Sequence, residues 1–204
     1  MSDLWTEPGV HVAPLSVFDW VQRLTPLYRE TARSHRRRVG RRWSIDETYI
    51  HIAGEWCDAF RAIDEESQII DVHVSTTRDR SAATTFLERA VESNKVTPYR
   101  ATTDKAPIYP PAFVAVIPEA EHVTSTMEQQ RIERDHQHLK DRTRCMRGFQ
   151  TLPCAQVVCK GHGFMRNLCD GCYELAVSVG DPRIPQALRL VGAWDELTAV
   201  LAAA

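Results

Sequence analysis

Apolar and polar positions alternate in short runs through the first half of the chain, which is typical of strands separated by turns. The runs at residues 43–52, 56–63 and 69–75 are rich in aromatic and β-branched side chains and predict three consecutive strands. Residues 80–92 place apolar side chains at helical spacing, and residues 99–103 predict a fourth strand. The order β-β-β-α-β indicates an α/β fold in which the fourth strand lies beside the first.

Residues 43–52 carry apolar side chains on both faces of the predicted strand. These side chains are Ile45 and Tyr49 on one face and Ile50 and Ile52 on the other. Covering on both faces predicts a central strand with helices packed on each side of the sheet. Asp46 lies inside this run, where a carboxylate is costly to desolvate unless a cation or a set of donors compensates.

The rest of the chain predicts mainly helices. We expect a short helix at residues 112–116, a short edge strand at residues 122–123 and a helix at about residues 152–168. A last helix at residues 183–203 would serve packing or self-association. Near the amino terminus, apolar spacing predicts a helix that begins at Pro14 or Leu15 and ends at Thr25.

Residues 127–144 contain no Gly or Pro and are mostly good helix formers. On a helix, one stripe would hold four ionisable side chains: Glu133, His136, Lys140 and Arg144. Ile132 and Leu139 would form a thinner apolar stripe elsewhere on the cylinder. A carboxylate flanked by cations suits a metal held beside a phosphate, and the alternative is a solvated helix with i,i+4 ion pairs.

Two more carboxylates favour the metal interpretation. Asp46 lies in the central strand, and Asp104 follows the strand at residues 99–103, where working residues of α/β sheets are usual. Together with Glu133 they form the carboxylate set of two-metal phosphoryl-transfer sites, in which two ions lie roughly 4 Å apart. Magnesium prefers such hard oxygen ligands and keeps several waters, so few protein ligands are enough.

Three segments resemble the DDE transposases of bacterial insertion sequences, and in particular the family named after insertion sequence six. They read SIDETYIHIAGEW, ATTDKAPIYPPA and QQRIERDHQHLKDRTRCMRGF, and the resemblance extends from Trp43 to residues 164–167. It implies a ribonuclease-H-like mixed sheet (β-β-β-α-β-α) flanked by helices, with a short helical N-terminal segment and a helical C-terminal extension. Only 28 residues separate Asp104 from Glu133, fewer than is usual in the family, so we expect a trimmed loop between residues 116 and 127.

By this resemblance, Asp46, Asp104 and Glu133 match the catalytic triad and would bind two Mg²⁺ or Mn²⁺ ions. Lys140 matches a basic residue seven positions after the glutamate, and with Lys105 it would contact DNA phosphates. The implied reaction is cleavage of DNA at the ends of the element, followed by transfer of the 3′-hydroxyl into target DNA. The alternatives are a catalytically idle remnant that only associates with DNA and a general ribonuclease-H-like nuclease.

Residues 29–42 hold seven arginines against the single acid Glu30, so they form either a solvated linker or a salt-dependent phosphate contact. The candidate DNA-binding arginines are Arg36, Arg37, Arg38, Arg41 and Arg42. By the resemblance, the helix before them is the recognition half of a helix-turn-helix whose leading helix is not visible, so we expect a truncated or replaced DNA-binding unit. The expected parts are this remnant with its linker (1–42), the catalytic core (43–150) and the C-terminal extension (151–204).

The neighbours of the triad allow further expectations. Glu47 should point to the opposite face from Asp46, because strand side chains alternate, so the two should not share a metal. Rival acids lie near turns or strand ends: Asp58, Asp64, Asp71 and Asp79. His136 would contact a phosphate or a carboxylate, or is an ordinary surface histidine. Catalysis needs no histidine, because a metal can lower the pKa of bound water unaided.

Composition limits these interpretations. The 204 residues suit one domain with a small appendage, and 43% hydrophobic residues are enough for a core. A net charge of −2 and a pI near 6.4 do not indicate a nucleic-acid binder, so DNA contact depends on where the basic residues lie. The sequence has no signal-peptide pattern and no long apolar segment, so we expect a cytoplasmic protein that does not span a membrane. The resemblance implies that it is bacterial, is associated with the nucleoid and works on DNA as a homodimer.

The cysteines of the C-terminal third raise the possibility of zinc. Cys169 and Cys172 have the spacing of a zinc knuckle, and Cys154 and Cys159 could supply a second pair. The latter two lie five positions apart in a predicted helix and do not share one face well. Reduced, partly buried thiols are therefore the favoured interpretation.

Overall fold

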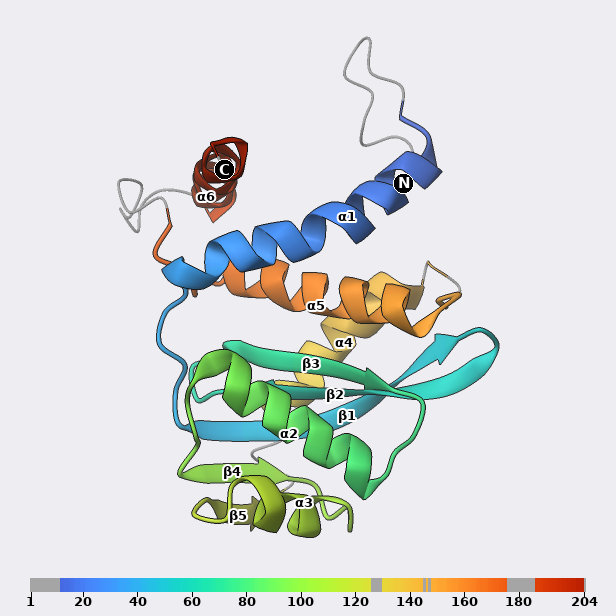
Figure 1. Ribbon diagram of the computed structural model, residues 1–204, viewed down its shortest axis with the longest axis vertical. Coiled ribbons are helices and arrows are strands. Elements are labelled where there is room, and N and C mark those ends of the chain that lie inside the picture. Colours follow the sequence, from blue (N-terminus) through green and yellow to red (C-terminus); the bar gives the residue numbers. More distant parts are fainter. Residues whose placement is uncertain (1–11, 126–129, 145, 147, 176–185, 204) are drawn as a thin grey trace.

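A five-stranded mixed sheet forms the centre of the computed structural model, which describes residues 12–125, 130–144, 146, 148–175 and 186–203. The strands are β1 (Arg42–Ile52), β2 (Glu55–Ile63), β3 (Ile69–Ser75), β4 (Arg100–Thr103) and β5 (Glu121–Thr124). Their order across the sheet is β3-β2-β1-β4-β5 (Figure 1). The first three strands form an antiparallel meander, and β4 and β5 run parallel to β1. The prediction of β1 as the central strand, with the fourth strand beside it, is confirmed.

A tight turn joins β1 to β2. Its central residues, Ala53 and Gly54, have φ values of 51° and 92°, and a two-residue hairpin turn of this hand requires positive φ at both. The turn fixes the register from Ile52↔Glu55 back to Ser44↔Ile63. The two residues of this turn therefore determine which residue of β2 lies opposite Asp46.

Helices cover both faces of the sheet. On one face α2 (Arg80–Asn94) and α3 (Tyr109–Val116) pack on a core that includes Trp43, Ile45 and Phe60. On the other, α4 (Gln130–Arg144) and α5 (Leu152–Cys169) bury Ile132, Leu139 and Cys159 against β1, β2 and β3 (Figure 1). This is the ribonuclease-H-like arrangement that the sequence predicted. One detail of the prediction was wrong. Tyr49 is 54% exposed, so of the two side chains expected on that face of β1 only Ile45 is buried.

Two further helices lie beyond α5, on its side away from the sheet (Figure 1). They are α1 (Pro14–Ala32), followed by the 3-10 turn η2 (Arg33–His35), and α6 (Gln186–Ala202). Tyr28 of α1 stacks on Trp194 of α6 with ring centroids 4.3 Å apart, and Ala32 is buried in the same cluster. The helix predicted to end at Thr25 continues through Pro26, because its last two turns gain this tertiary packing. Among the described residues, no helix has the length and apolar character needed to cross a membrane.

Candidate active site

The helix α4 crosses the face of the sheet at Asp46. Asp46 is buried, Glu133 is exposed, and each can offer an oxygen within 4.8 Å of the other and of a ring nitrogen of His136. His136 Nδ1 lies 3.6 Å from Asp46 Oδ2. The predicted pairing of the central-strand acid with the helix acid is therefore present in the structure.

The third acid lies on the neighbouring strand. β4 pairs with β1 up to Ser44↔Thr102 and ends at Thr103, which brings Asp104 beside Asp46. Asp46, Glu47 and Asp104 can each offer an oxygen within 4.8 Å of the other two. Asp104 Oδ1 also accepts a hydrogen bond of 2.8 Å from the Ala106 N–H, which orients the carboxylate in the loop. Asp46 thus belongs to both groups of possible ligands.

The expectation that Glu47 lies apart from Asp46 is wrong. Its side chain is only 3% exposed, accepts hydrogen bonds from the Tyr109 hydroxyl and the Arg78 guanidinium, and lies within the same acidic group. Because β4 ends at Thr103 while β1 continues beside β2, the edge of β1 away from β2 is unpaired at this point. The long glutamate side chain can therefore approach the neighbouring carboxylates around the edge of the strand.

Burial and mutual repulsion determine the electrostatics of this acidic group. Burial, followed by repulsion from Glu47, Glu133 and Asp104, raises the pKa of Asp46 to about 7. Burial also raises the pKa of Glu47, although its bonds to Tyr109 and Arg78 oppose this. A bound cation would compensate such a set, and carboxylate oxygens are the ligands that magnesium prefers. The residues present therefore fit a divalent metal.

His136 faces the acids as a neutral group. Its side chain is almost completely buried, and burial, followed by Arg61 and Lys140, lowers its pKa to about 3. A buried neutral imidazole beside Asp46 can hold that carboxylate in place. It cannot reach a DNA phosphate in this position, so the predicted phosphate contact is not available to His136.

The remaining predicted DNA-binding residues differ in exposure. Lys105, Lys140, Arg37, Arg38, Arg41 and Arg42 are exposed. Arg36 instead directs its guanidinium inward, to the carbonyl oxygens of Ile69 (2.5 Å) and Ile70 (3.4 Å) and to Asn94 Oδ1 (2.7 Å). Arg36 therefore ties the linker to the fold, and its guanidinium has little capacity left for DNA.

Three of the four rival acids have structural partners. Asp64 accepts hydrogen bonds from three backbone N–H groups, Asp71 lies 3.2 Å from Lys160 Nζ, and Asp79 caps α2 through the Ala82 N–H. The cysteines of the described residues form no disulfide, and none belongs to a group close enough to bind a metal. Cys145 lies outside the described residues.

A buried ion pair that was not predicted lies next to the acids. Arg61 of β2 is the cross-strand partner of Asp46, and its Nε lies 2.7 Å from Asp135 Oδ2 on α4. Arg61 Nη2 also lies 3.2 Å from His162 Nδ1 of α5. The signal was available, since an arginine within the apolar run 56–63 needs a buried partner and Asp135 lies two residues after Glu133.

Comparison with known proteins gives consistent results. A family model described as a DDE domain matches residues 40–171. The transposase of the insertion sequence-like element IS431mec from Staphylococcus aureus is 33% identical over 168 residues, which cover 79% of this chain and 72% of the relative. The Staphylococcus aureus transposase of IS257 in transposon Tn4003 matches over the same length with the same identity.

Solved retroviral structures have similar folds at low identity. The catalytic core domain of BIV integrase has a TM-score of 0.45 at 14% identity, covering 79% of this chain and 99% of that one. The HTLV-2 integrase catalytic core domain in complex with magnesium has a TM-score of 0.41 at 14% identity, covering 76% and 84%.

The fold, the clustered acids and the matched DDE domain define a DDE-type polynucleotidyl transferase. The relatives narrow this class. The chain belongs to the DDE transposases of the insertion-sequence-six family, of the type found in IS431 and IS257.

Proposed function

We propose that this transposase cleaves DNA at the ends of an insertion sequence and joins the freed 3′-hydroxyl to target DNA. Asp46, Asp104 and Glu133 would bind two Mg²⁺ or Mn²⁺ ions. When bound, such ions act as Lewis acids that generate a strong nucleophile and stabilise the leaving oxygen. The observation that carries the proposal is that Asp46 belongs to both groups of possible metal ligands, one with Glu133 and one with Asp104.

The two chemical steps are alike. In the first, a water oxygen bonds to the phosphorus at the end of the element and the bond from phosphorus to the 3′-oxygen breaks, leaving a 3′-hydroxyl. In the second, that hydroxyl loses its proton, its oxygen bonds to a target phosphorus, and the target's own 3′-oxygen leaves. The same carboxylates serve both steps, because both are displacements at a phosphodiester.

The protein's other side chains would orient these acids and the DNA. His136 holds Asp46 from the helix side, and the Arg78 guanidinium lies 3.4 Å from Asp104 Oδ2 while also binding Glu47. Lys105 and Lys140 are exposed beside the acids and would contact phosphates. Of the arginines before β1, we propose the exposed ones as further backbone contacts and leave out Arg36.

One observation favours the alternative of an idle, DNA-associating protein. The Arg78 cation already pairs with Glu47 and Asp104, which is what a site without metal would need. The homodimer and the division into residues 1–42, 43–150 and 151–204 stay predictions.

The test is metal-dependent nicking of oligonucleotide duplexes that carry the inverted repeats flanking the gene. We expect nicking with Mg²⁺ or Mn²⁺, none with EDTA, and loss of nicking in Asp46→Asn and Glu133→Gln. Asp141→Asn, which removes an exposed acid of the same helix, is the matched control and should nick like the wild type. Unchanged nicking by Asp46→Asn would refute the assignment. Binding without nicking would favour the idle alternative, and cutting without regard to repeats would indicate a general nuclease.

A further inference from the structure

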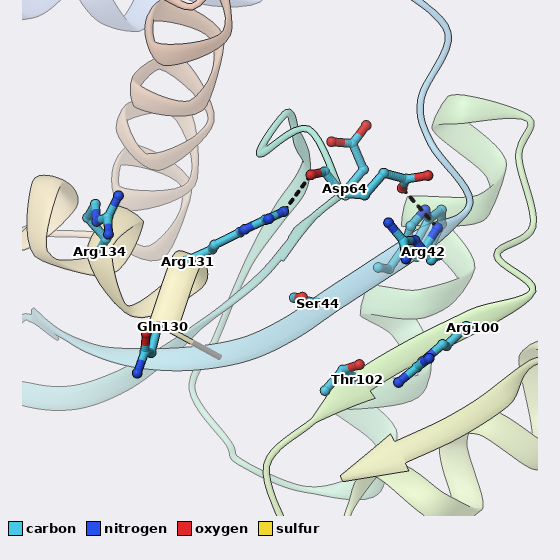
Figure 2. A pocket seen from close by; sticks show the side chains of 10 residues that line it. Arg42, Ser44, Asp64, Arg100, Thr102, Gln130, Arg131 and Arg134 are labelled. Carbon is cyan, nitrogen blue, oxygen red and sulfur yellow. Dashed lines mark hydrogen bonds between the residues drawn. The ribbon is translucent and has the colours of Figure 1, made fainter. Parts of the chain in front are cut away.

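Four arginines surround a cavity of about 460 Å³ that opens beside the acids. Arg42 and Arg100 come from the first residues of β1 and β4, and Arg131 and Arg134 from the first turns of α4. Figure 2 shows Arg131 reaching from α4 toward the loop after β2, with Arg42 and Arg100 on the other side. The Ser44 and Thr102 side chains lie between the two sides (Figure 2).

Positive charge dominates this cavity. Its two acidic lining residues, Asp64 and Glu65, are engaged with backbone groups: Asp64 is buried and accepts three N–H groups, and Glu65 Oε2 accepts the Arg42 N–H at 3.0 Å. Arg131 Nη1 donates to the Glu65 carbonyl oxygen at 2.5 Å, which directs that side chain across the opening. The whole chain has a net charge of −2, so a group of four arginines is a local feature.

The cavity and the acids share one face of the sheet. Ser44 and Asp46 are two residues apart on β1, so their side chains point the same way, and α4 carries Glu133 between Arg131 and Arg134. Two strand residues span roughly 7 Å. Neighbouring phosphates of one DNA strand are separated by a similar distance, because the strand winds around an axis along which it rises only about 3.4 Å per nucleotide.

We propose that this arginine cavity, formed by Arg42, Arg100, Arg131 and Arg134, binds a backbone phosphate of the DNA about one nucleotide from the phosphodiester that is cut. The proposal rests on the proposed function for its position relative to the cut. Guanidinium forks match phosphate oxygens with two parallel hydrogen bonds, and the serine and threonine hydroxyls between them can add others. Such contacts read no bases, so the cavity would fix the register of the strand without selecting its sequence.

The first measurement is DNA affinity without metal. We would titrate a repeat-bearing duplex in EDTA, by fluorescence anisotropy, from 50 to 200 mM KCl. Arg131→Gln and Arg134→Gln should each weaken binding about tenfold, and each should reduce the salt slope by about 0.9. Arg131→Lys should fall between Arg131→Gln and the wild type. Arg189→Gln, which removes an exposed arginine of the distant α6, is the control of equal charge and should bind like the wild type.

The second measurement locates the contact. Single methylphosphonates, which remove one phosphate charge, would be placed along the strand that is cut. Near the position one nucleotide from the cut, the neutral linkage should weaken wild-type binding but add little to Arg131→Gln. Equal affinities and salt slopes for Arg131→Gln, Arg134→Gln and Arg189→Gln, or no coupling at any linkage, would overturn the proposal. If the wild type binds with these slopes but does not nick DNA, the proposed function fails while the phosphate site stands.

Discussion

Replacing Asp135 by Asn should destabilise the fold strongly, because it removes one partner of a buried ion pair. The Arg61 side chain is completely buried and that of Asp135 is 11% exposed, with 2.7 Å between Nε and Oδ2. In the variant, the Arg61 guanidinium keeps only an amide and the neutral ring of His162 near it. Leaving one buried charge unpaired in this way costs about 3–5 kcal/mol. For a domain of this size, that corresponds to a fall in Tm of about 6–20 °C.

Urea unfolding followed by circular dichroism would measure this loss. Asp141→Asn is the matched control, since Asp141 pairs with Arg144 on the same helix at 3.6 Å with side chains 54% and 76% exposed. It should lose no more than about 1 kcal/mol. A double variant, Arg61→Met with Asp135→Leu, removes both charges and should be more stable than Asp135→Asn. If Asp135→Asn unfolds at the same urea concentration as Asp141→Asn, the buried Arg61–Asp135 pair does not stabilise the packing of α4 on the sheet.

Two further predictions concern neighbouring groups. Tyr109→Phe should destabilise the protein by about 1–3 kcal/mol in urea unfolding, because Glu47 loses a buried donor, whereas Tyr99→Phe at a half-exposed ring should change little. Burial, with Arg61 as the next cause, lowers the pKa of His162 in the folded protein to about 3. An unfolded histidine titrates near 6.5, so the unfolded state binds the proton first as the pH falls, and the folded state loses stability. Between pH 7.5 and pH 5, the free energy of unfolding of the wild type should therefore fall by up to about 2 kcal/mol more than that of His162→Gln. His138→Gln, at an exposed histidine, is the control. Equal pH dependence of the wild type and His162→Gln would contradict this.

Most of the sheet was predictable because its signal is local. Strands 56–63 and 69–75 were predicted within one residue of their observed bounds, and the charged helix at residues 127–144 matches α4 over its described residues. Ile132 and Leu139 are its buried stripe as expected. The site acids were also local signals, since each lay at a position where an unpaired carboxylate would be unfavourable or where a sheet usually carries function.

The errors came from tertiary contacts that alternation and composition do not contain. Alternation gives the direction of the Glu47 Cβ, but not that β4 stops short and lets the carboxylate turn toward Asp46. The arginine run predicted a DNA contact for Arg36, yet its guanidinium donates to backbone carbonyls at the start of β3. Apolar spacing predicted a helix that ends at Thr25, but packing on α5 and α6 lets α1 continue through Pro26 to Ala32.

The three acids are also held in place by unequal means. Asp46 lies within β1 and Asp104 directly after β4, and the parallel ladder between these strands fixes their spacing. Glu133 lies on α4, which makes no backbone hydrogen bond to the sheet among the described residues. Apolar packing of Ile132 and Leu139 holds α4 down, but such packing is not directional and permits sliding and rotation.

Two polar contacts on consecutive residues remove that freedom. Asp135 reaches Arg61 on β2, and His136 reaches Asp46 on β1. Since Arg61 and Asp46 are cross-strand partners, the Asp135–Arg61 ion pair restricts the rotation and the axial position of α4 against one step of the ladder, and the buried His136 ring packs beside the same step. Two apolar residues in place of Arg61 and Asp135 could make the core equally stable, but they would not fix the position of α4 along the strands. We infer that the buried charges are kept for geometry, because the position of Glu133 relative to Asp46 depends on them.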